Sequence, residues 1–267
     1  MKAFTDQQKL AAIILPMCTG FVSSLASGTI IYSILRSSVK LKVPYRRLIF
    51  GLSCFDFIVS VSFALSTLPM PSESGLIPEL ALGTESTCTA QGFFFIFGFL
   101  GSVFYSCSLS IYYFCTLKLN MPFTRFQKNC EVYLHLLSIG WALVACVICL
   151  ADDSFNATPT HCTVTSFPQE CIEDNEIECI KGKRSYIYQW AFVAVPSFAV
   201  FLTIVYVMIS IGKKFAFLEP CTVVPESYPR IWWCLTVSQD EMTTHHSPNL
   251  LNLISWQQFA CTVSRKM

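Results

Sequence analysis

The chain has 267 residues, of which 53% are hydrophobic and 13% charged, and its mean hydropathy is +0.53. This composition is too apolar for a soluble domain of that length and predicts an integral membrane protein. The formal net charge is +1, and no basic run indicates a nucleic-acid-binding surface. Most of the 14 cysteines lie inside apolar runs, where a free thiol behaves as a small hydrophobic side chain.

The first candidate span lies between Lys9 and Arg36, in a long stretch without charge. It predicts a membrane helix over about 10–35, since about 20 apolar residues cross a bilayer. Residues 1–9 do not read as a cleavable signal peptide, so they are expected to remain as an extracellular N-terminus. The segment from Arg36 to Arg47 is basic and has no acidic residue, which places it in the cytoplasm by the positive-inside rule.

A second span is expected over about 48–69, and the acidic loop after it fits the outer side. The third span, over about 90–117, belongs to a charge-free stretch that begins at Ser86, next to Cys88. Small and polar residues alternate with aromatic residues along this stretch. Helices that approach one another closely need that pattern, so the third span is expected to be the central helix of a bundle.

A second basic segment returns the chain to the cytoplasmic side, and a fourth span follows over about 132–151. The segment 152–184 is acidic and contains the sequon Asn156-Ala157-Thr158, so we expect an extracellular loop glycosylated at Asn156. A fifth span covers about 185–212, and 213–267 is expected to be a poorly ordered cytoplasmic tail. The basic residues expected on the cytoplasmic side are Arg36, Lys40, Lys42, Arg46, Arg47, Lys118, Arg125 and Lys128.

Four cysteines are expected on the outer side: Cys88, Cys162, Cys171 and Cys179. They allow three pairings, and sequence alone selects none of them. A bond from Cys88 to the loop would pin the loop across the mouth of the bundle and contribute about 2–4 kcal/mol. The alternative is that the loop cysteines pair among themselves and Cys88 stays free.

Asp56 is the acidic residue inside an apolar run, so it should have a polar partner. It is either a site linked to an ion or a proton, or a residue solvated near the cytoplasmic end. Glu131 and His135 stand one helical turn apart and are expected to form a surface pair worth a few tenths of a kcal/mol.

Trp141 is expected to be a packing residue of the fourth span. Pro196 should kink the fifth span and leave a carbonyl that a neighbouring side chain satisfies. No glycine-rich phosphate loop, zinc-binding helix motif or nucleophile elbow occurs, so we expect neither an enzyme nor a cofactor or metal site.

The chain resembles the first five helices of a seven-helix G-protein-coupled receptor. The features that carry this resemblance are, in order, the first basic segment, Asp56 in the second span, Cys88 at the third, Trp141 in the fourth, the cysteine-containing loop and Pro196 in the fifth. The resemblance covers roughly residues 10–212 and implies an all-α membrane protein, a five-span helical bundle. The run Thr87–Phe94, the pair Tyr112-Tyr113 and the pair Glu131 with His135 are similar to receptor-like proteins of diatoms and other protists. Those proteins are distantly related to the slime-mould cyclic-AMP receptor and to secretin-type receptors.

The resemblance implies a multi-pass protein of the plasma membrane with an extracellular ligand and, as a possible partner, a G protein or an intact receptor. It also implies a bond from Cys88 to a loop cysteine, with Cys88–Cys162 and Cys171–Cys179 as the favoured pairs. Tyr112-Tyr113-Phe114 stands where the family has Asp-Arg-Tyr, and helices six and seven are missing. We therefore expect a truncated receptor that is impaired in signalling. The competing hypotheses are a small transporter or channel subunit that uses Asp56, and a truncated regulator of an intact receptor.

Overall fold

The computed structural model describes residues 6–72, 80–168, 171 and 178–218. The chain divides after Phe215 into two units, and of the second unit the structure describes only the end of α7. Most of the expected tail, 213–267, therefore lies outside the described residues, as do 1–5 of the expected extracellular N-terminus.

Among the described residues, five helices are long enough and apolar enough to cross a membrane, which confirms the predicted five-span helical bundle. The first two are α1 (Asp6–Arg36) and α2 (Pro44–Leu65). The other three contain short π-helical segments: α3 (Glu85–Tyr113) with η2 (Phe114–Lys118); α4 (Phe123–Phe126) with η3 (Gln127–Glu131) and α5 (Val132–Ala151); and α6 (Ser185–Tyr188) with η5 (Gln189–Ala194) and α7 (Val195–Leu218).

The residues at which these helices begin are set by prolines and capping side chains, and not by the start of the apolar stretch. Helix α2 begins at Pro44, before the expected 48, because a proline in the first turn lacks an N–H that would have no partner there. Helix α3 begins at Glu85 through a capping box between Thr84 and Thr87. The fourth helix begins after Pro122, so Glu131 lies inside it and not at its start.

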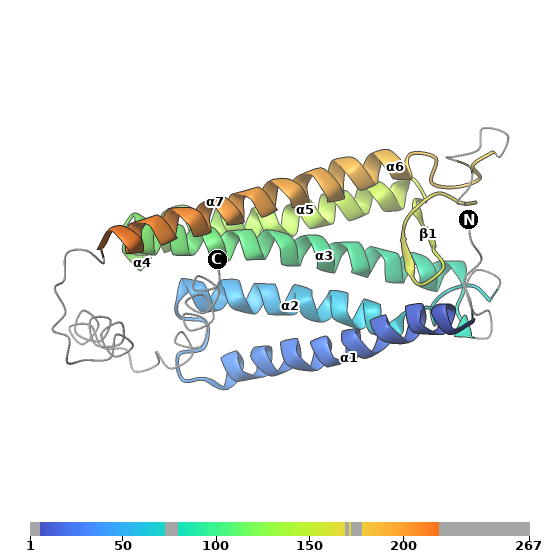
Figure 1. The fold of residues 1–267 in the computed structure, drawn as a ribbon, viewed down its shortest axis with the longest axis horizontal. Coiled ribbons are helices and arrows are strands. Elements are labelled where there is room, and N and C mark those ends of the chain that lie inside the picture. Colours follow the sequence, from blue (N-terminus) through green and yellow to red (C-terminus); the bar gives the residue numbers. More distant parts are fainter. Residues whose placement is uncertain (1–5, 73–79, 169–170, 172–177, 219–267) are drawn as a thin grey trace. The chain divides into compact units, whose positions relative to one another are not determined.

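Helix α3 packs against α2 on one side and α5 on the other, and α1 packs on α2 (Figure 1). Two glycines permit the close contacts. A Cβ at Gly98 of α3 would lie 2.7 Å from the Val59 nitrogen, and one at Gly20 of α1 would lie 2.6 Å from the Ala64 nitrogen. Small residues at helix contacts in membranes allow this approach.

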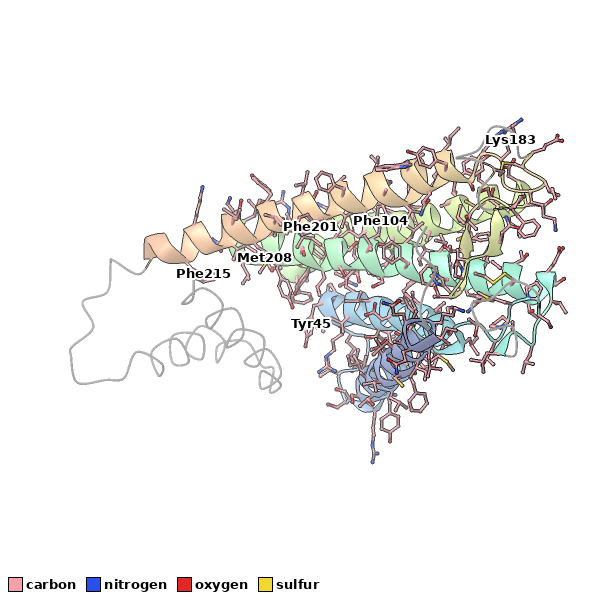
Figure 2. All side chains as sticks on the ribbon, turned by 45° about the vertical axis from the view of Figure 1, so that its right-hand side comes forward. Tyr45, Phe104, Lys183, Phe201, Met208 and Phe215 are labelled. Carbon is pink, nitrogen blue, oxygen red and sulfur yellow. A yellow bond between two sulfur atoms is a disulfide. The ribbon has the colours of Figure 1, made fainter. Side chains whose placement is uncertain are left out.

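The fifth helix is the least covered. Of its most apolar stretch 11% is buried, against 39% for the third helix, in agreement with the predicted central place of the third helix. Apolar side chains such as Phe201 and Met208 project from α7 without cover (Figure 2). Such a surface is stable where the surrounding solvent is lipid.

One end of the bundle carries a hairpin of β1 (Phe155–Ala157) and β2 (Cys162–Val164), paired antiparallel. The end of α1, the start of α2 and helix α4 lie at the opposite end (Figure 1). We call these the hairpin end and the basic end, because the two expected cytoplasmic basic segments occupy the latter.

Candidate functional site

The hairpin is tied to the third helix through Cys88, which forms a disulfide with Cys162. Gln91, one turn further along α3, secures the same strand, since its Oε1 accepts a hydrogen bond from the Cys162 nitrogen at 3.2 Å. Its Nε2 donates to the carbonyls of Ser62 at 3.0 Å and Ser66 at 2.7 Å. Gln91 is buried and joins α2, α3 and the hairpin, a role that its type and position in the sequence did not indicate.

The tip of the hairpin places His161 among aromatic rings of the bundle. Its ring centroid lies 4.9 Å from that of Phe95 on α3 and 5.8 Å from that of Phe63 on α2. The Thr160 hydroxyl lies 3.0 Å from His161 Nδ1, and Ser66 Oγ donates to the Thr160 carbonyl at 3.1 Å. Burial lowers the pKa of His161, because removal from water disfavours the imidazolium form. We call His161, Phe63 and Phe95 the aromatic mouth; sequence analysis did not single out any of them.

Other described residues of the segment 152–184 are also held by specific bonds. Cys171 and Cys179 form a second disulfide, so both pairs in the structure are those that the family resemblance implies. Lys181 Nζ lies 2.7 Å from Glu85 Oε2 at the start of α3. The loop is therefore joined to α3 through the Cys88 sulfur, the Glu85 carboxylate and the Gln91 side chain.

Asn156, the predicted glycosylation site, is buried in the structure. Its side-chain nitrogen donates to the carbonyls of Asp153 at 3.2 Å and Thr165 at 2.8 Å, and the residue is only 9% exposed. An attached glycan would replace one of these N–H groups and would have to leave a buried site. This burial argues against a glycan at Asn156 in the folded chain, a feature that a sequon cannot indicate, and glycosylation at Asn156 stays a prediction.

Asp56 contacts the third helix, where Ser102 Oγ donates a hydrogen bond to its Oδ1. The side chain is partly buried in α2. It therefore has the polar partner that an acidic residue at this depth requires.

At the basic end a polar cluster joins the second, third and fourth helices. Arg47 donates from Nε and Nη2 to the two oxygens of Glu131, with Nη2 at 2.7 Å from Oε2. Glu131 also lies 3.6 Å from His135 Nε2, and His135 Nδ1 lies 2.8 Å from the Tyr105 hydroxyl. We call these four residues the inner cluster.

The inner cluster corrects the expectation of a surface pair at Glu131 and His135. The Glu131 side chain is only 6% exposed, and its main partner is Arg47, 84 positions earlier in the sequence. The expectation failed because the fourth helix begins at Phe123, which carries Glu131 inward. A buried carboxylate held by two N–H groups of one guanidinium is a strong, directional contact.

The other basic residues lie around this end in more open surroundings. Arg46 donates to Ser37 at 2.6 Å, and Arg36 donates to Tyr32 at 2.6 Å. Lys118 lies over the Phe114 ring, 5.1 Å from its centroid. Lys40, Lys42, Arg125 and Lys128 are exposed.

Trp141 and Pro196, expected to be a packing residue and a kink, act together. Proline at 196 has no N–H for the carbonyl of Phe192 four residues earlier. Trp141 Nε1 donates to that carbonyl at 3.2 Å, and the π-helical segment η5 lies next to the proline. The indole thus links the fourth and fifth helices at the point where the backbone lacks a donor.

The described residues contain no group of three or more His, Cys, Asp or Glu side chains that could hold a metal ion. The two candidate sites are therefore the aromatic mouth with its disulfide-bound hairpin, and the inner cluster. Both connect helices of the bundle.

No family model and no curated protein matches the chain. Among solved structures it is similar to squid rhodopsin, with a TM-score of 0.54 and 12% sequence identity. The match covers 82% of this chain and 56% of the rhodopsin chain, so the chain spans little more than half of that structure. At this identity the likeness concerns the fold alone, which over the five long helices of the described residues is that of squid rhodopsin. The finer resemblance to protist receptor-like proteins stays a prediction.

Proposed function

We propose that the chain is a receptor-like protein of the G-protein-coupled receptor class that binds an extracellular ligand at the hairpin end. The observation that carries this proposal is the position of the hairpin tip, where His161 lies beside Phe63 and Phe95 and is anchored by the next residue, Cys162. A loop fixed in this way forms one wall of a binding site, while the helices supply the others. The receptor fold shared with squid rhodopsin supports the same reading.

The proposed location is the plasma membrane, with the hairpin outside and the basic end inside. Its support is the separation of charge along the bundle, because both basic segments lie at the end opposite the hairpin (Figure 1). Positively charged short loops remain in the cytoplasm during membrane insertion.

The proposed intracellular partner is a G protein or an intact receptor, and it would meet the basic end. Lys214 of the fifth helix supports this, because its ammonium group binds the end of the third helix. It donates to the carbonyls of Leu117 at 2.7 Å and Lys118 at 3.2 Å, and to Asn120 Oδ1 at 2.9 Å. A movement of the fifth helix would therefore be transmitted to the loop after the third.

The test is nucleotide exchange by purified heterotrimeric G proteins on liposomes that contain the full chain. We expect exchange to be only slightly faster than on empty liposomes, as for a receptor impaired in signalling, and to respond to small apolar or aromatic compounds added outside. Phe95→Ala should abolish the response to such compounds, whereas Phe198→Ala, at an exposed position on α7, should leave it unchanged.

A competing outcome is defined by Asp56, whose partly buried carboxylate in α2 would also suit an ion-conducting protein. If the chain leaves G-protein exchange unchanged while its liposomes pass ions, and Asp56→Asn stops that flux, the receptor proposal fails and the transporter hypothesis replaces it.

A further inference from the structure

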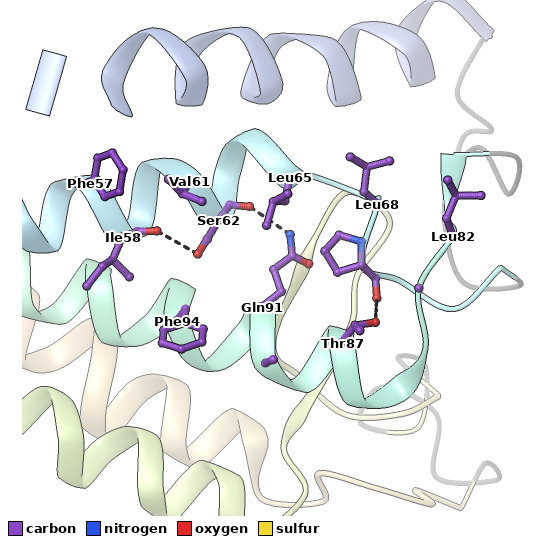
Figure 3. A pocket seen from close by; sticks show the side chains of 13 residues that line it. Phe57, Ile58, Val61, Ser62, Leu65, Leu68, Leu82, Thr87, Gln91 and Phe94 are labelled. Atoms are coloured by element: carbon purple, nitrogen blue, oxygen red, sulfur yellow. Dashed lines mark hydrogen bonds between the residues drawn. The ribbon is translucent and has the colours of Figure 1, made fainter. Parts of the chain in front are cut away.

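A pocket of about 670 Å³ lies between α2 and α3 at the hairpin end (Figure 3). Phe57, Val61 and Leu65 line it from α2, at intervals of one helical turn. Thr87 and Phe94 line it from α3. Phe63 and Phe95 are not part of its lining, so this pocket is separate from the aromatic mouth.

The pocket is closed at both ends along the helices. One helical turn after Phe94, Gly98 brings α3 against the backbone of α2, so no space remains between the two helices at that level. At the hairpin end the described parts of the connection between α2 and α3, residues 66–72 and 80–84, form a roof. Thr87 Oγ1 donates to the Pro69 carbonyl at 2.7 Å, and the Leu82 nitrogen donates to the Leu68 carbonyl at 3.2 Å, so the roof is bonded in place.

The side of the pocket is open to the surroundings of the bundle. Several of its apolar side chains are well exposed, including Phe94 at 51% and Leu82 at 77%. Because α2 and α3 are membrane-spanning helices, this open side faces lipid.

The polar side chains of the lining have no free hydrogen-bond donor left for a ligand. Ser62 Oγ donates to the Ile58 carbonyl, and both N–H groups and the oxygen of Gln91 are bonded within the protein. Thr87 Oγ1 accepts from the Thr84 nitrogen while it donates to Pro69. No charged residue is among those lining the pocket. A ligand that carries polar groups into it would lose hydrogen bonds to water without replacement.

The size of the pocket excludes a helix as its occupant. The distance from Phe57 to Leu65 is about 12 Å at a rise of roughly 1.5 Å per residue, which is much shorter than a membrane span. A transmembrane helix, about 10–12 Å wide with its side chains, would also meet the roof. A sterol fits less well than an unbranched chain, because its hydroxyl oxygen would find no free side-chain donor in the lining.

We propose that this pocket binds one acyl chain of a phospholipid from the membrane leaflet at the hairpin end, with the head group remaining outside the roof. A site of this volume is within the range of small-molecule pockets, and its lining matches a hydrocarbon chain. Such a lipid would contact the helix that carries Cys88 and Gln91, and so would support the base of the hairpin.

The test is native mass spectrometry of the full chain released from nanodiscs of phosphatidylcholine, with and without added sterol. We expect the wild-type chain to retain phosphatidylcholine and Ala90→Trp to retain one molecule fewer. Ala90 lines the pocket and is exposed, so the indole fills the space without disturbing the packed side of α3. Ala199→Trp, at an exposed alanine of α7, is the matched control and should retain the wild-type number.

Val61→Trp, which fills the pocket from α2, should reproduce the loss. Thermal unfolding of each variant verifies that it is folded. The proposal is overturned if Ala90→Trp and Val61→Trp retain as much phosphatidylcholine as the wild type. It is also overturned if sterol displaces phosphatidylcholine from the wild type but not from Ala90→Trp, or if the wild type is released as a dimer that Ala90→Trp dissociates.

Discussion

At the hairpin end the helices are joined through a loop, by the Cys88–Cys162 disulfide and by backbone bonds to Gln91. At the basic end they are joined by side chains of the helices themselves, through the buried pair of Arg47 and Glu131. The Cys88–Cys162 disulfide requires oxidising conditions and does not depend on charge. The Arg47–Glu131 ion pair depends on charge and is not affected by reducing agents. A ligand at the hairpin end would therefore affect the contacts of the hairpin, while the Arg47–Glu131 pair keeps the helices together at the basic end.

The largest effect is expected from breaking the inner cluster. Arg47→Met leaves the Glu131 carboxylate buried without its main partner and should reduce the free energy of unfolding by about 3–5 kcal/mol. Arg125→Met, at an exposed position, should change it by less than about 0.5 kcal/mol. Thermal and denaturant unfolding in detergent measure both. Equal stability of the two variants would show that the inner cluster does not hold the helices.

The next effect concerns the hairpin end. Replacing Cys88 and Cys162 by serine opens a link between residues 74 positions apart, and should cost about 2–4 kcal/mol. The pair Cys171–Cys179 is separated by 8 positions, so its removal should cost less, because a shorter loop loses less entropy on closure. Hydrogen exchange should rise in 155–164 for the first variant alone. Increased exchange at Glu131 as well would mean that the two ends are not independent.

A smaller effect tests the link between the fourth and fifth helices. Trp141→Phe removes the donor to the Phe192 carbonyl and should cost about 1–3 kcal/mol, as for a buried acceptor that loses its partner. Pro196→Ala supplies a backbone N–H at that place, so Trp141→Phe should cost less in the Pro196→Ala background. A double-mutant cycle measures the difference, and strict additivity of the two changes would contradict the assigned bond.

The smallest effect is a pH dependence of the hairpin. Burial lowers the pKa of His161 below its ordinary value of about 6.5, so the folded hairpin holds fewer protons than the unfolded one. The contribution of neutral His161 is therefore complete above about pH 6.5 and is lost as the pH falls from there toward the lowered pKa. Hydrogen exchange in 155–164 should rise across that window. In His161→Phe the rise should vanish; if it persists, another group is responsible.

The five spans could be predicted from the sequence, because a run of apolar residues long enough to cross the bilayer indicates a membrane helix. It did not predict the Arg47–Glu131 pair, since two charges 84 positions apart carry no mark of their contact, and Glu131 was read as the start of a helix. The carbonyl left free by Pro196 was expected to have a partner, but its identity as Trp141 depends on how two helices face each other. His161 has no local signature either, because its environment is made by rings from other segments.

Lysine labelling tests the orientation of the bundle, on which the receptor proposal depends. Cells expressing the chain are treated with a membrane-impermeant amine reagent before or after permeabilisation, and labelled lysines are located by mass spectrometry. Lys183, exposed at the hairpin end, should be labelled on intact cells, whereas Lys40 and Lys128, exposed at the basic end, should be labelled only after permeabilisation. Labelling of Lys40 and Lys128 on intact cells, with Lys183 protected, would invert the orientation and contradict the account.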